Sequence, residues 1–175
     1  MKFCYECGTK LEAKELEGEG MIPYCQCCGK YVFPIYSTAV SMIVQSPDRK
    51  KILLIQQYGT GNNVLVAGYI NKGENAESAV RREVMEEIGI ETDEICFNKS
   101  EYFPKTNTLM LNFSCIALSE DLSHLSEKEI DRAAWFDIAA ARDSIMPDSL
   151  AKRFLFAFLD GKQFDGNVIT RNDKK

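Results

Sequence analysis

Three glutamates near the middle of the chain are spaced so that they could hold a metal ion together. Glu83, Glu86 and Glu87 stand at positions i, i+3 and i+4, which share one face of a helix. Carboxylates at this spacing repel one another, and a divalent cation among their oxygens would relieve the repulsion. Mg²⁺ and Mn²⁺ prefer oxygen ligands, can bridge carboxylates to phosphates, and can activate water. The spacing therefore suits a metal site that acts on a phosphate compound.

The surrounding residues predict the helix that presents these glutamates. Residues 76–88 carry apolar side chains at helical spacing, and Gly89 is typical of a helix C-terminus. Taken alone, this run of glutamates favours the solvated face of an ordinary helix, and only the longer pattern around it favours the metal site. The apolar positions are Ala79, Val80, Val84 and Ile88.

The glutamates belong to a longer pattern. Gly68 is followed after five residues by Glu74, and after seven more by Arg82-Glu83-Val84-Met85-Glu86-Glu87-Ile88-Gly89-Ile90. By chance, seven fixed and two aliphatic positions would coincide at a given start on the order of once in 10⁹. The pattern resembles, at every position, the signature of the Nudix hydrolases. A hydrolase with the α/β/α sandwich of that family, built around a mixed sheet, is therefore expected.

The resemblance implies roles for single residues. Glu83 and Glu87 would hold Mg²⁺ or Mn²⁺ with Glu86 close by as a further catalytic residue, and the backbone carbonyl of Ala67 would be another ligand. Which carboxylate acts as the general base stays open. The residues that would brace the loop are Gly68, Glu74, Arg82 and Gly89.

A later glutamate completes the expected catalytic set. The family places a metal-binding glutamate six residues before an aromatic-rich strand, and Glu129 lies six residues before Trp135. Glu127 is the competing position. We predict that Glu129 joins the metal site.

Cysteines near the N-terminus predict a second, structural metal site. Cys4 and Cys7 form one C-x₂-C pair and Cys25 and Cys28 another, and each pair is followed by glycine. This spacing is typical of a four-cysteine zinc site, which leaves no open position for catalysis. Cys27 could compete for the metal, and reduced cysteines without metal are the alternative. Of the other cysteines, Cys96 and Cys115 lie in apolar, strand-like surroundings and are expected in the core.

A zinc ribbon joined to this domain resembles the NADH pyrophosphatase subfamily over residues 4–160. Residues 100–110 occupy the place of that subfamily's substrate motif. Phe103 stands for its tryptophan, whereas Lys105 and Thr106 replace a phenylalanine and a proline. Lys105 could instead meet a phosphate or carboxylate of the substrate.

Other substrate contacts are implied by the same resemblance. Phe33 and Tyr69 match aromatic positions that hold the base portions of a dinucleotide, and Ala151 matches a small residue near the substrate. Ordinary packing is the alternative role for each of the three.

The expected reaction is the metal-dependent hydrolysis of a small nucleotide, with NAD(H) giving AMP and nicotinamide mononucleotide. ADP-ribose, FAD or the NAD cap of an RNA are alternative substrates for the same chemistry. A non-catalytic module that binds nucleotides or nucleic acid is the alternative from another class. Relatives often form homodimers, and the further N-terminal domain usual in the subfamily is expected to be missing here.

The whole chain sets broader limits. Its 175 residues suffice for one main domain and a small module, expected at 1–34 for the ribbon, 35–165 for the Nudix domain and 166–175 for a tail. A net charge of −5 argues against a broadly basic surface for nucleic acid. The sequence has no signal-peptide layout or membrane-spanning run, so we expect a cytoplasmic protein. Strands are predicted at 35–44, 52–57, 64–69, 94–103, 109–118 and 133–136, and a closing helix at 150–159.

Overall fold

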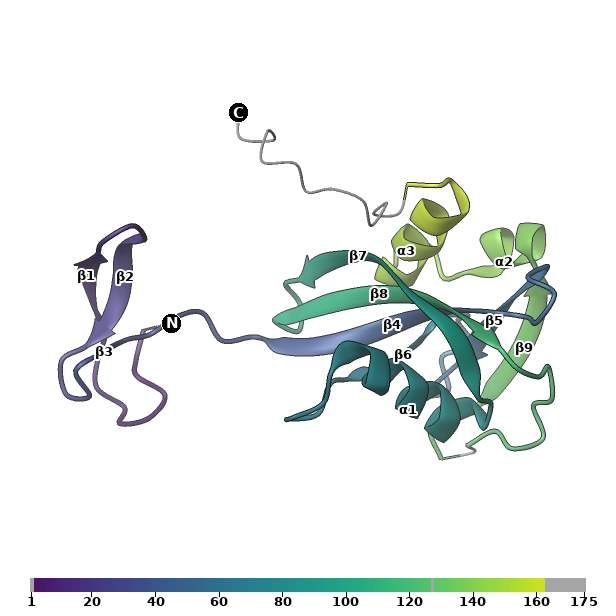
Figure 1. Cartoon of the computed structure of the whole chain (residues 1–175), viewed down its shortest axis with the longest axis horizontal. Coiled ribbons are helices and arrows are strands. Elements are labelled where there is room, and N and C mark those ends of the chain that lie inside the picture. The colour runs from purple at the N-terminus through teal and green to yellow at the C-terminus, as the bar shows by residue number, and fades with distance from the viewer. Residues whose placement is uncertain (1, 127, 163–175) are drawn as a thin grey trace. The chain divides into compact units, whose positions relative to one another are not determined.

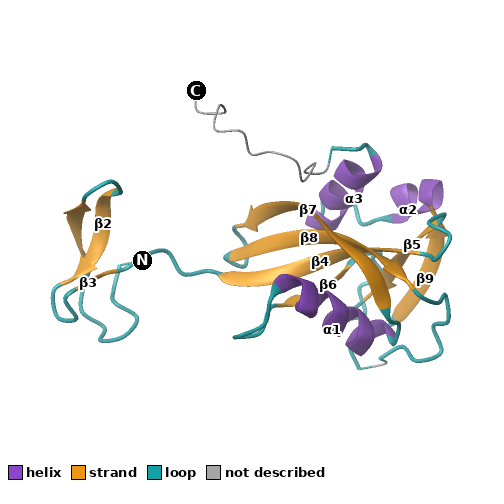
Figure 2. Ribbon diagram, viewed as in Figure 1, coloured by secondary structure: helices purple, strands orange, loops and turns teal. Residues whose placement is uncertain are grey.

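A mixed sheet of six strands forms the centre of the larger unit in the computed structural model, which describes residues 2–126 and 128–162 (Figures 1 and 2). The strand order is β7-β8-β4-β5-β9, and β6 also pairs with β4. Strands β4 and β8 are parallel, whereas the other pairs are antiparallel. The strands are β4 (Ser37–Gln45), β5 (Lys51–Gln56), β6 (Val66–Tyr69), β7 (Thr92–Phe103), β8 (Thr108–Ala117) and β9 (Arg132–Asp137).

Helices cover both faces of this sheet. Helix α1 (Ala76–Ile88) lies on one face, and α2 (Ile138–Ser144) and α3 (Leu150–Leu159) lie on the other (Figure 1). Each face of the sheet packs against its helices in a separate hydrophobic core, and successive residues of β4 point to opposite faces. Val40 and Met42 lie in the core under α1, and Ile43 lies in the core under α2 and α3. The predicted α/β/α sandwich with a mixed sheet is confirmed. None of the described helices is long and apolar enough to cross a membrane.

Helix α1 begins and ends where its sequence predicts. The Asn75 side chain accepts a hydrogen bond from the backbone N–H of Ser78 at 2.8 Å and caps the first turn. Gly89 ends the helix in the left-handed region at φ 76°, and its N–H donates to the Met85 carbonyl. The predicted span and its buried apolar stripe are confirmed, and so is the span of α3.

Sequence analysis missed one helix and was wrong about one cysteine. Helix α2 was not predicted: it has only seven residues, and its cap, Asp137, makes no side-chain hydrogen bond to the first turn. Cys96 is exposed rather than in the core. The register of β7 against β8 shifts between Asp93 and Cys96, so the alternation of faces is broken just before this cysteine. Cys115 is buried, as predicted.

The smaller unit, Met1–Tyr36, is described by itself. Its three-stranded antiparallel sheet consists of β1 (Glu12–Leu16), β2 (Gly20–Cys25) and β3 (Lys30–Tyr31). Its buried hydrophobic cluster contains three residues, Cys4, Cys25 and Val32, among those described. This core is too small to account for a stable fold by burial alone.

Replacing Gly89 with alanine should destabilise the larger unit more than replacing Gly73. Both glycines have positive φ, at 76° and 88°, so each substitution should cost about 1–2 kcal/mol. A Cβ at Gly89 would also lie 2.5 Å from the Cβ of His124, whereas one at Gly73 meets open space. The clash should add about 1–3 kcal/mol in Gly89→Ala. Urea unfolding followed through Trp135, the single tryptophan, measures both. Equal losses in the two variants would contradict the clash.

Candidate functional site

Two of the three helical glutamates are buried side by side. Glu83 and Glu87, one turn apart on α1, are only 8% and 4% exposed. Glu86 is not buried with them, because its side chain is 58% exposed. Among the described residues, Oε2 of Glu87 is buried without a hydrogen-bond partner. A buried carboxylate oxygen normally has a partner, so this atom suits a cation ligand.

Gly68 makes room for the first of these carboxylates. It lies in β6, opposite Val40 of β4. A Cβ at this position would lie 1.9 Å from Cδ of Glu83. No residue with a side chain can therefore stand there unless the carboxylate moves. A glycine is therefore required at position 68 because the Glu83 carboxylate lies so close to the backbone. Its conformation is not the reason, since its φ is not in the left-handed region.

Arg82 ties the loop before α1 to the helix. Its guanidinium donates to both carboxylate oxygens of Glu74, at 2.9 and 3.0 Å, and to the backbone carbonyl of Tyr69 at 3.0 Å. It also reaches Glu83 at 2.7 Å and Glu86 at 3.0 Å. The hydrogen bond from Arg82 lowers the pKa of Glu74, and the same bond raises the pKa of Arg82. The bidentate geometry fixes the loop that carries β6 into α1.

The buried carboxylates open into a pocket of about 690 Å³. Among the predicted site residues, those that line it are Ala67, Gly68, Tyr69, Glu83, Glu87, Phe103 and Glu129. Lining residues that sequence analysis did not select are Ala39, Gln57, Tyr58, Asn71, Thr106, Thr108 and Met110. Three of them, Thr106, Thr108 and Met110, fall within the stretch at residues 100–110 that takes the place of the substrate motif. The other four come from separate strands and loops that only the fold brings together.

Three residues of the larger unit that were predicted for catalysis or substrate binding do not line this pocket. Glu86 and Lys105 are exposed, and Ala151 is half-buried in α3 among the core residues of that face. Phe33 belongs to the smaller unit, which is described by itself, and is 52% exposed there. The competitor of Glu129, Glu127, lies outside the described residues.

The segment that carries Glu129 is attached to α1. The backbone N–H of Ser126 donates to the Glu87 carbonyl at 2.9 Å, and the N–H of Glu129 donates to the Ser126 carbonyl at 3.2 Å. Ile130, the next residue, is buried in the core beneath α1. These contacts hold an exposed glutamate at the same pocket as the two buried ones.

Burial and mutual repulsion disfavour charge on these acids. Loss of solvation raises the pKa of Glu87 from its ordinary 4.5 to about 8, and the charges of Glu83 and Glu129 add to the effect. Burial also raises the pKa of Glu83, although Arg82 opposes the shift. A cation held among these carboxylates would favour their charged forms.

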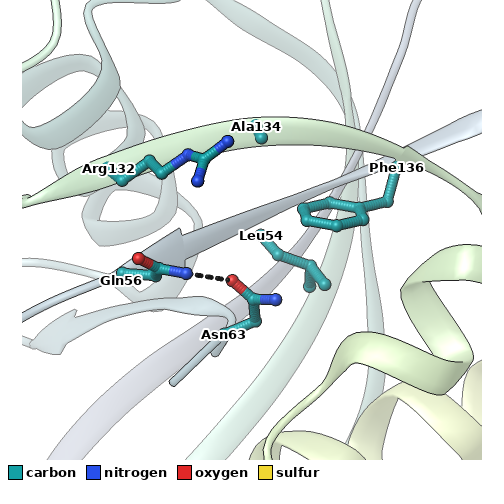
Figure 3. A pocket seen from close by; sticks show the side chains of 6 residues that line it. All are labelled: Leu54, Gln56, Asn63, Arg132, Ala134 and Phe136. Carbon is teal, nitrogen blue, oxygen red and sulfur yellow. Dashed lines mark hydrogen bonds between the residues drawn. The ribbon is translucent and has the colours of Figure 1, made fainter. Parts of the chain in front are cut away.

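A smaller cavity of about 230 Å³ has a different character. Its walls come from β5, β9 and the loop before β6, and the Gln56 amide donates to Oδ1 of Asn63 at 3.0 Å (Figure 3). The lining residues are Leu54, Gln56, Asn63, Arg132, Ala134 and Phe136. No carboxylate lines it, so it does not suit a divalent cation.

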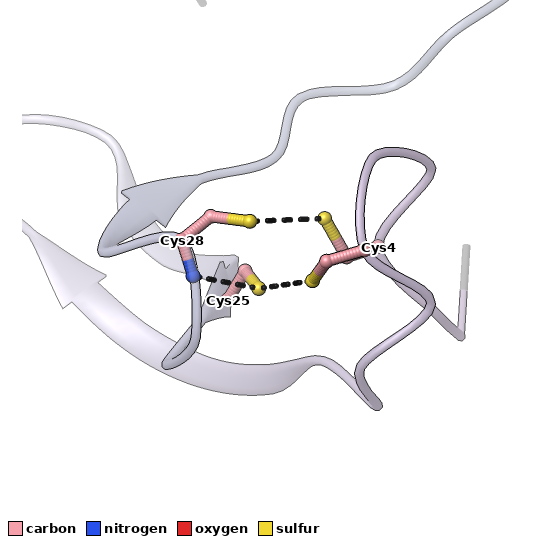
Figure 4. Close-up of side chains that lie close together, drawn as sticks. Cys4, Cys25 and Cys28 are labelled. Carbon is pink, nitrogen blue, oxygen red and sulfur yellow. Dashed lines mark hydrogen bonds between the residues drawn. The ribbon is translucent and has the colours of Figure 1, made fainter.

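Four cysteines of the smaller unit converge. The sulfur atoms of Cys4, Cys7, Cys25 and Cys28 all lie within 4.8 Å of one another. Figure 4 labels three of these side chains, Cys4, Cys25 and Cys28, which point toward one another. The separations are 3.5 Å for Cys7–Cys25 and 4.0 Å for Cys4–Cys28. A tetrahedral zinc with Zn–S bonds of about 2.3 Å requires sulfurs about 3.8 Å apart, so the set fits that ion. Cys27 is exposed and outside the group.

Turns and hydrogen bonds shape this cluster. The N–H of Gly8 donates to the Cys4 carbonyl and that of Gly29 to the Cys25 carbonyl, both at 2.9 Å, so the two C-x₂-C-G segments form equivalent turns. Both glycines have positive φ, which other residues rarely adopt. Hydrogen bonds with Thr9 lower the pKa of the Cys7 thiol to about 6, which favours the thiolate that binds metal.

The metal-free protein should lose stability as pH rises. Because the pKa of Glu87 is higher in the folded state, the folded protein binds more protons than the unfolded one between about pH 4.5 and 8. The free energy of unfolding should fall across this window, by at most about 5 kcal/mol, and Glu87→Gln should lose most of the fall. Urea unfolding from pH 5 to 8.5, with and without Mg²⁺, tests this. A slope unchanged in Glu87→Gln would refute it, and Mg²⁺ should stabilise the wild type more at pH 8 than at pH 5.

Comparisons with known proteins agree with this architecture. A NUDIX domain model matches residues 35–158. The chain is 28% identical over 158 residues to the NAD-capped RNA hydrolase NudC of Pseudomonas aeruginosa, covering 90% of this chain and 55% of that protein. It is 33% identical over 143 residues to the chloroplastic Nudix hydrolase 19 of Arabidopsis thaliana, covering 77% and 32%. The chain thus spans about half or less of the length of these two relatives.

Solved structures show the same fold. A NUDIX hydrolase from Nitrosomonas europaea superimposes with a TM-score of 0.61 at 22% identity, covering 92% of this chain and 94% of that one. The family match spans most of the chain and includes the complete pattern from Gly68 to Ile90. Within this pattern Glu83 and Glu87 line the pocket, and Arg82 binds Glu74 beside it. The chain belongs to the Nudix family.

Proposed function

We propose that the chain is a metal-dependent hydrolase that cleaves the pyrophosphate of a nucleoside diphosphate linked to another group. The observation that carries the proposal is the buried pair Glu83 and Glu87, with Glu129 in the same pocket and one carboxylate oxygen unpartnered. A module that only bound nucleotides would have no need of this arrangement, because burying two acids together lowers stability.

Each residue of the site has a role in this proposal. Glu83, Glu87 and Glu129, with the backbone carbonyl of Ala67, would hold Mg²⁺ or Mn²⁺. The bound ion would neutralise the pyrophosphate and favour attack by water. Arg82 and Glu74 would fix the position of α1 relative to β6, so that the Glu83 carboxylate stays next to Gly68. In hydrolysis, water adds to one phosphorus, the bridging P–O bond breaks, and two phosphate monoesters leave.

NAD(H) is the first substrate we propose, with AMP and nicotinamide mononucleotide as products. Tyr69 and Phe103 line the pocket beside the carboxylates, and such rings stack on bases for about 1–3 kcal/mol each. Lys105, although exposed, lies on the same β7–β8 turn as Thr106, which does line the pocket.

Removal of an NAD cap from RNA is the second candidate. The relatives from Pseudomonas aeruginosa and Chromobacterium violaceum carry the name NAD-capped RNA hydrolase. The same bond would break, with the dinucleotide in the pocket and the RNA outside it. ADP-ribose and FAD are further candidates, because each contains the same pyrophosphate bond with a different group attached to the ADP.

For the smaller unit we propose a structural zinc bound by Cys4, Cys7, Cys25 and Cys28. Their sulfur separations suit a tetrahedral ion, and four thiolates leave it no open position. The ion would take the place of the core that this unit lacks.

The wild type should hydrolyse NADH with Mg²⁺ or Mn²⁺, and Glu87→Gln should lower kcat at least about 10²-fold. The amide keeps the shape of the side chain but removes the charge that attracts the ion. The matched control is Glu77→Gln, an exposed acid in the first turn of the same helix, which should keep wild-type turnover.

The assay should compare kcat/KM for NADH, NAD, ADP-ribose, FAD and an RNA with a 5′ NAD cap. If both NAD forms and the capped RNA are inert while another nucleotide turns over, the substrate proposal fails. If no compound turns over, or if Glu87→Gln matches the wild type, the catalytic proposal fails.

Zinc content tests the cysteine site separately. Protein prepared without chelator should contain one zinc per chain, Cys25→Ser should lose it because one of four ligands is gone, and Cys27→Ser should keep it. Metal analysis by mass spectrometry makes the comparison. Full zinc in Cys25→Ser together with loss in Cys27→Ser would show that the ligand set is wrong.

A further inference from the structure

The loop between β5 and β6 brings an unassigned aromatic residue to the catalytic pocket. Gln57 and Tyr58, at the start of this loop, line the pocket together with Glu83, Glu87 and Glu129. The Tyr58 side chain offers a ligand the face and edge of its ring, together with a phenolic hydroxyl.

Tyr58 is held in an unusual way for an apolar ring. It is 85% exposed, the highest exposure among the large hydrophobic residues that the structure describes. Its φ of 58° lies in the left-handed region, which is uncommon for a bulky residue, and Gly59 follows with φ 64°. A strained, exposed ring at a pocket is a reason to look for a ligand contact.

Contacts with the Glu129 segment keep this loop in place. The N–H of Gly59 donates to Oδ2 of Asp131 at 2.6 Å, and the N–H of Asp131 donates to the Gln56 carbonyl at 2.9 Å. Asp131 is two residues from Glu129. The loop with Tyr58 and the segment with Glu129 are therefore fixed to each other at one side of the pocket.

The other two rings of the pocket stand on the sheet. Tyr69 of β6 is the register partner of Ala39 in β4, and Ala39 is the partner of Met110 in β8. Phe103 of β7 lies opposite Thr108 of β8. All five residues line the pocket, so two rings flank a floor of alanine and methionine. This platform offers more apolar area than one tyrosine and suits the larger, purine base.

We propose that Tyr58 is a stacking subsite for the second planar ring of a dinucleotide substrate. The inference rests on the proposed function: the purine lies on the sheet platform, the pyrophosphate meets the carboxylates, and the second ring packs on Tyr58. The chemical class that fits is a dinucleotide pyrophosphate with an aromatic group at each end, such as NAD.

NAD and ADP-ribose form a matched pair for the test, because they differ by the nicotinamide ring alone. Tyr58→Ala should lower kcat/KM for NAD about tenfold, within the range of base–aromatic stacking, and change that for ADP-ribose less than twofold. Tyr58→Phe should keep the wild-type value for both. Asn62→Ala, an exposed position of the same loop that does not line the pocket, is the control and should match the wild type.

Three outcomes would overturn the subsite. No change in Tyr58→Ala would show that the ring is not used, and equal losses for both substrates would place it against the part that they share. A loss in Asn62→Ala as large as in Tyr58→Ala would assign the effect to loop disturbance.

Binding separates this subsite from the catalytic proposal. Calorimetric Kd values for NAD and ADP-ribose, measured in the Glu87→Gln background, need no turnover. Weaker binding of NAD alone in the Tyr58→Ala double variant would support the subsite even if hydrolysis failed. Unchanged Kd values, or no binding of NAD by the Glu87→Gln protein, would overturn it.

Discussion

Two carboxylates buried on adjacent turns of α1 constrain the rest of the larger unit. Moving an ion out of water carries a penalty of several kcal/mol unless partners compensate. The Glu83 carboxylate forms an ion pair with Arg82. Oε2 of Glu87 has no hydrogen-bond partner among the described residues, and burial raises the pKa of Glu87 to about 8. Apolar cores on both faces of the sheet must supply the stability that this arrangement removes. A site so unfavourable without a cation is consistent with selection for chemistry rather than for stability.

The neighbouring structure can be understood as a consequence of that burial. Gly68 is where β6 passes directly over the Glu83 carboxylate, so β6 must pair with β4 at a register that places a glycine there. Arg82 of α1 attaches this end of β6 to the helix by donating hydrogen bonds to Glu74 and to the Tyr69 carbonyl. On the other side, the Glu87 carbonyl accepts a hydrogen bond from Ser126 and so attaches the segment of Glu129. One helix therefore positions acids from its own turns and from a distant loop.

The parts of this arrangement that sequence analysis could predict are those with local signals. The span of α1 follows from its apolar period, the Asn75 cap and Gly89. The cysteine pairs are likewise local signals, because each C-x₂-C-G segment forms a turn that brings its own two cysteines together. Helix α2 lacks such signals, and the exposure of Cys96 depends on a register shift that the β7 sequence does not reveal.

The pocket itself could be predicted only in part. Glu83 and Glu87 are adjacent on one helix, so helical geometry alone brings them together. Tyr58 lines the same pocket, and its loop is held there by Asp131, which is 72 residues away from Gly59. Such a contact leaves no periodicity in the sequence. The role of Phe33 depends on a different unit and stays a prediction.

Each unit gathers several ionisable side chains at one place, cysteines in the smaller unit and glutamates in the larger, but the proposed role of a bound metal ion differs between them. The smaller one has a described core of three residues, two of them cysteines of the cluster, so a zinc there would be part of the core itself. Four thiolates would close the ion off from water and substrate. In the larger unit the sheet and helices fold around their own apolar cores, and the carboxylates face an open pocket. An ion there would leave positions free for phosphate and water. Removal of zinc should therefore act on folding of the small unit, whereas removal of Mg²⁺ should act on turnover.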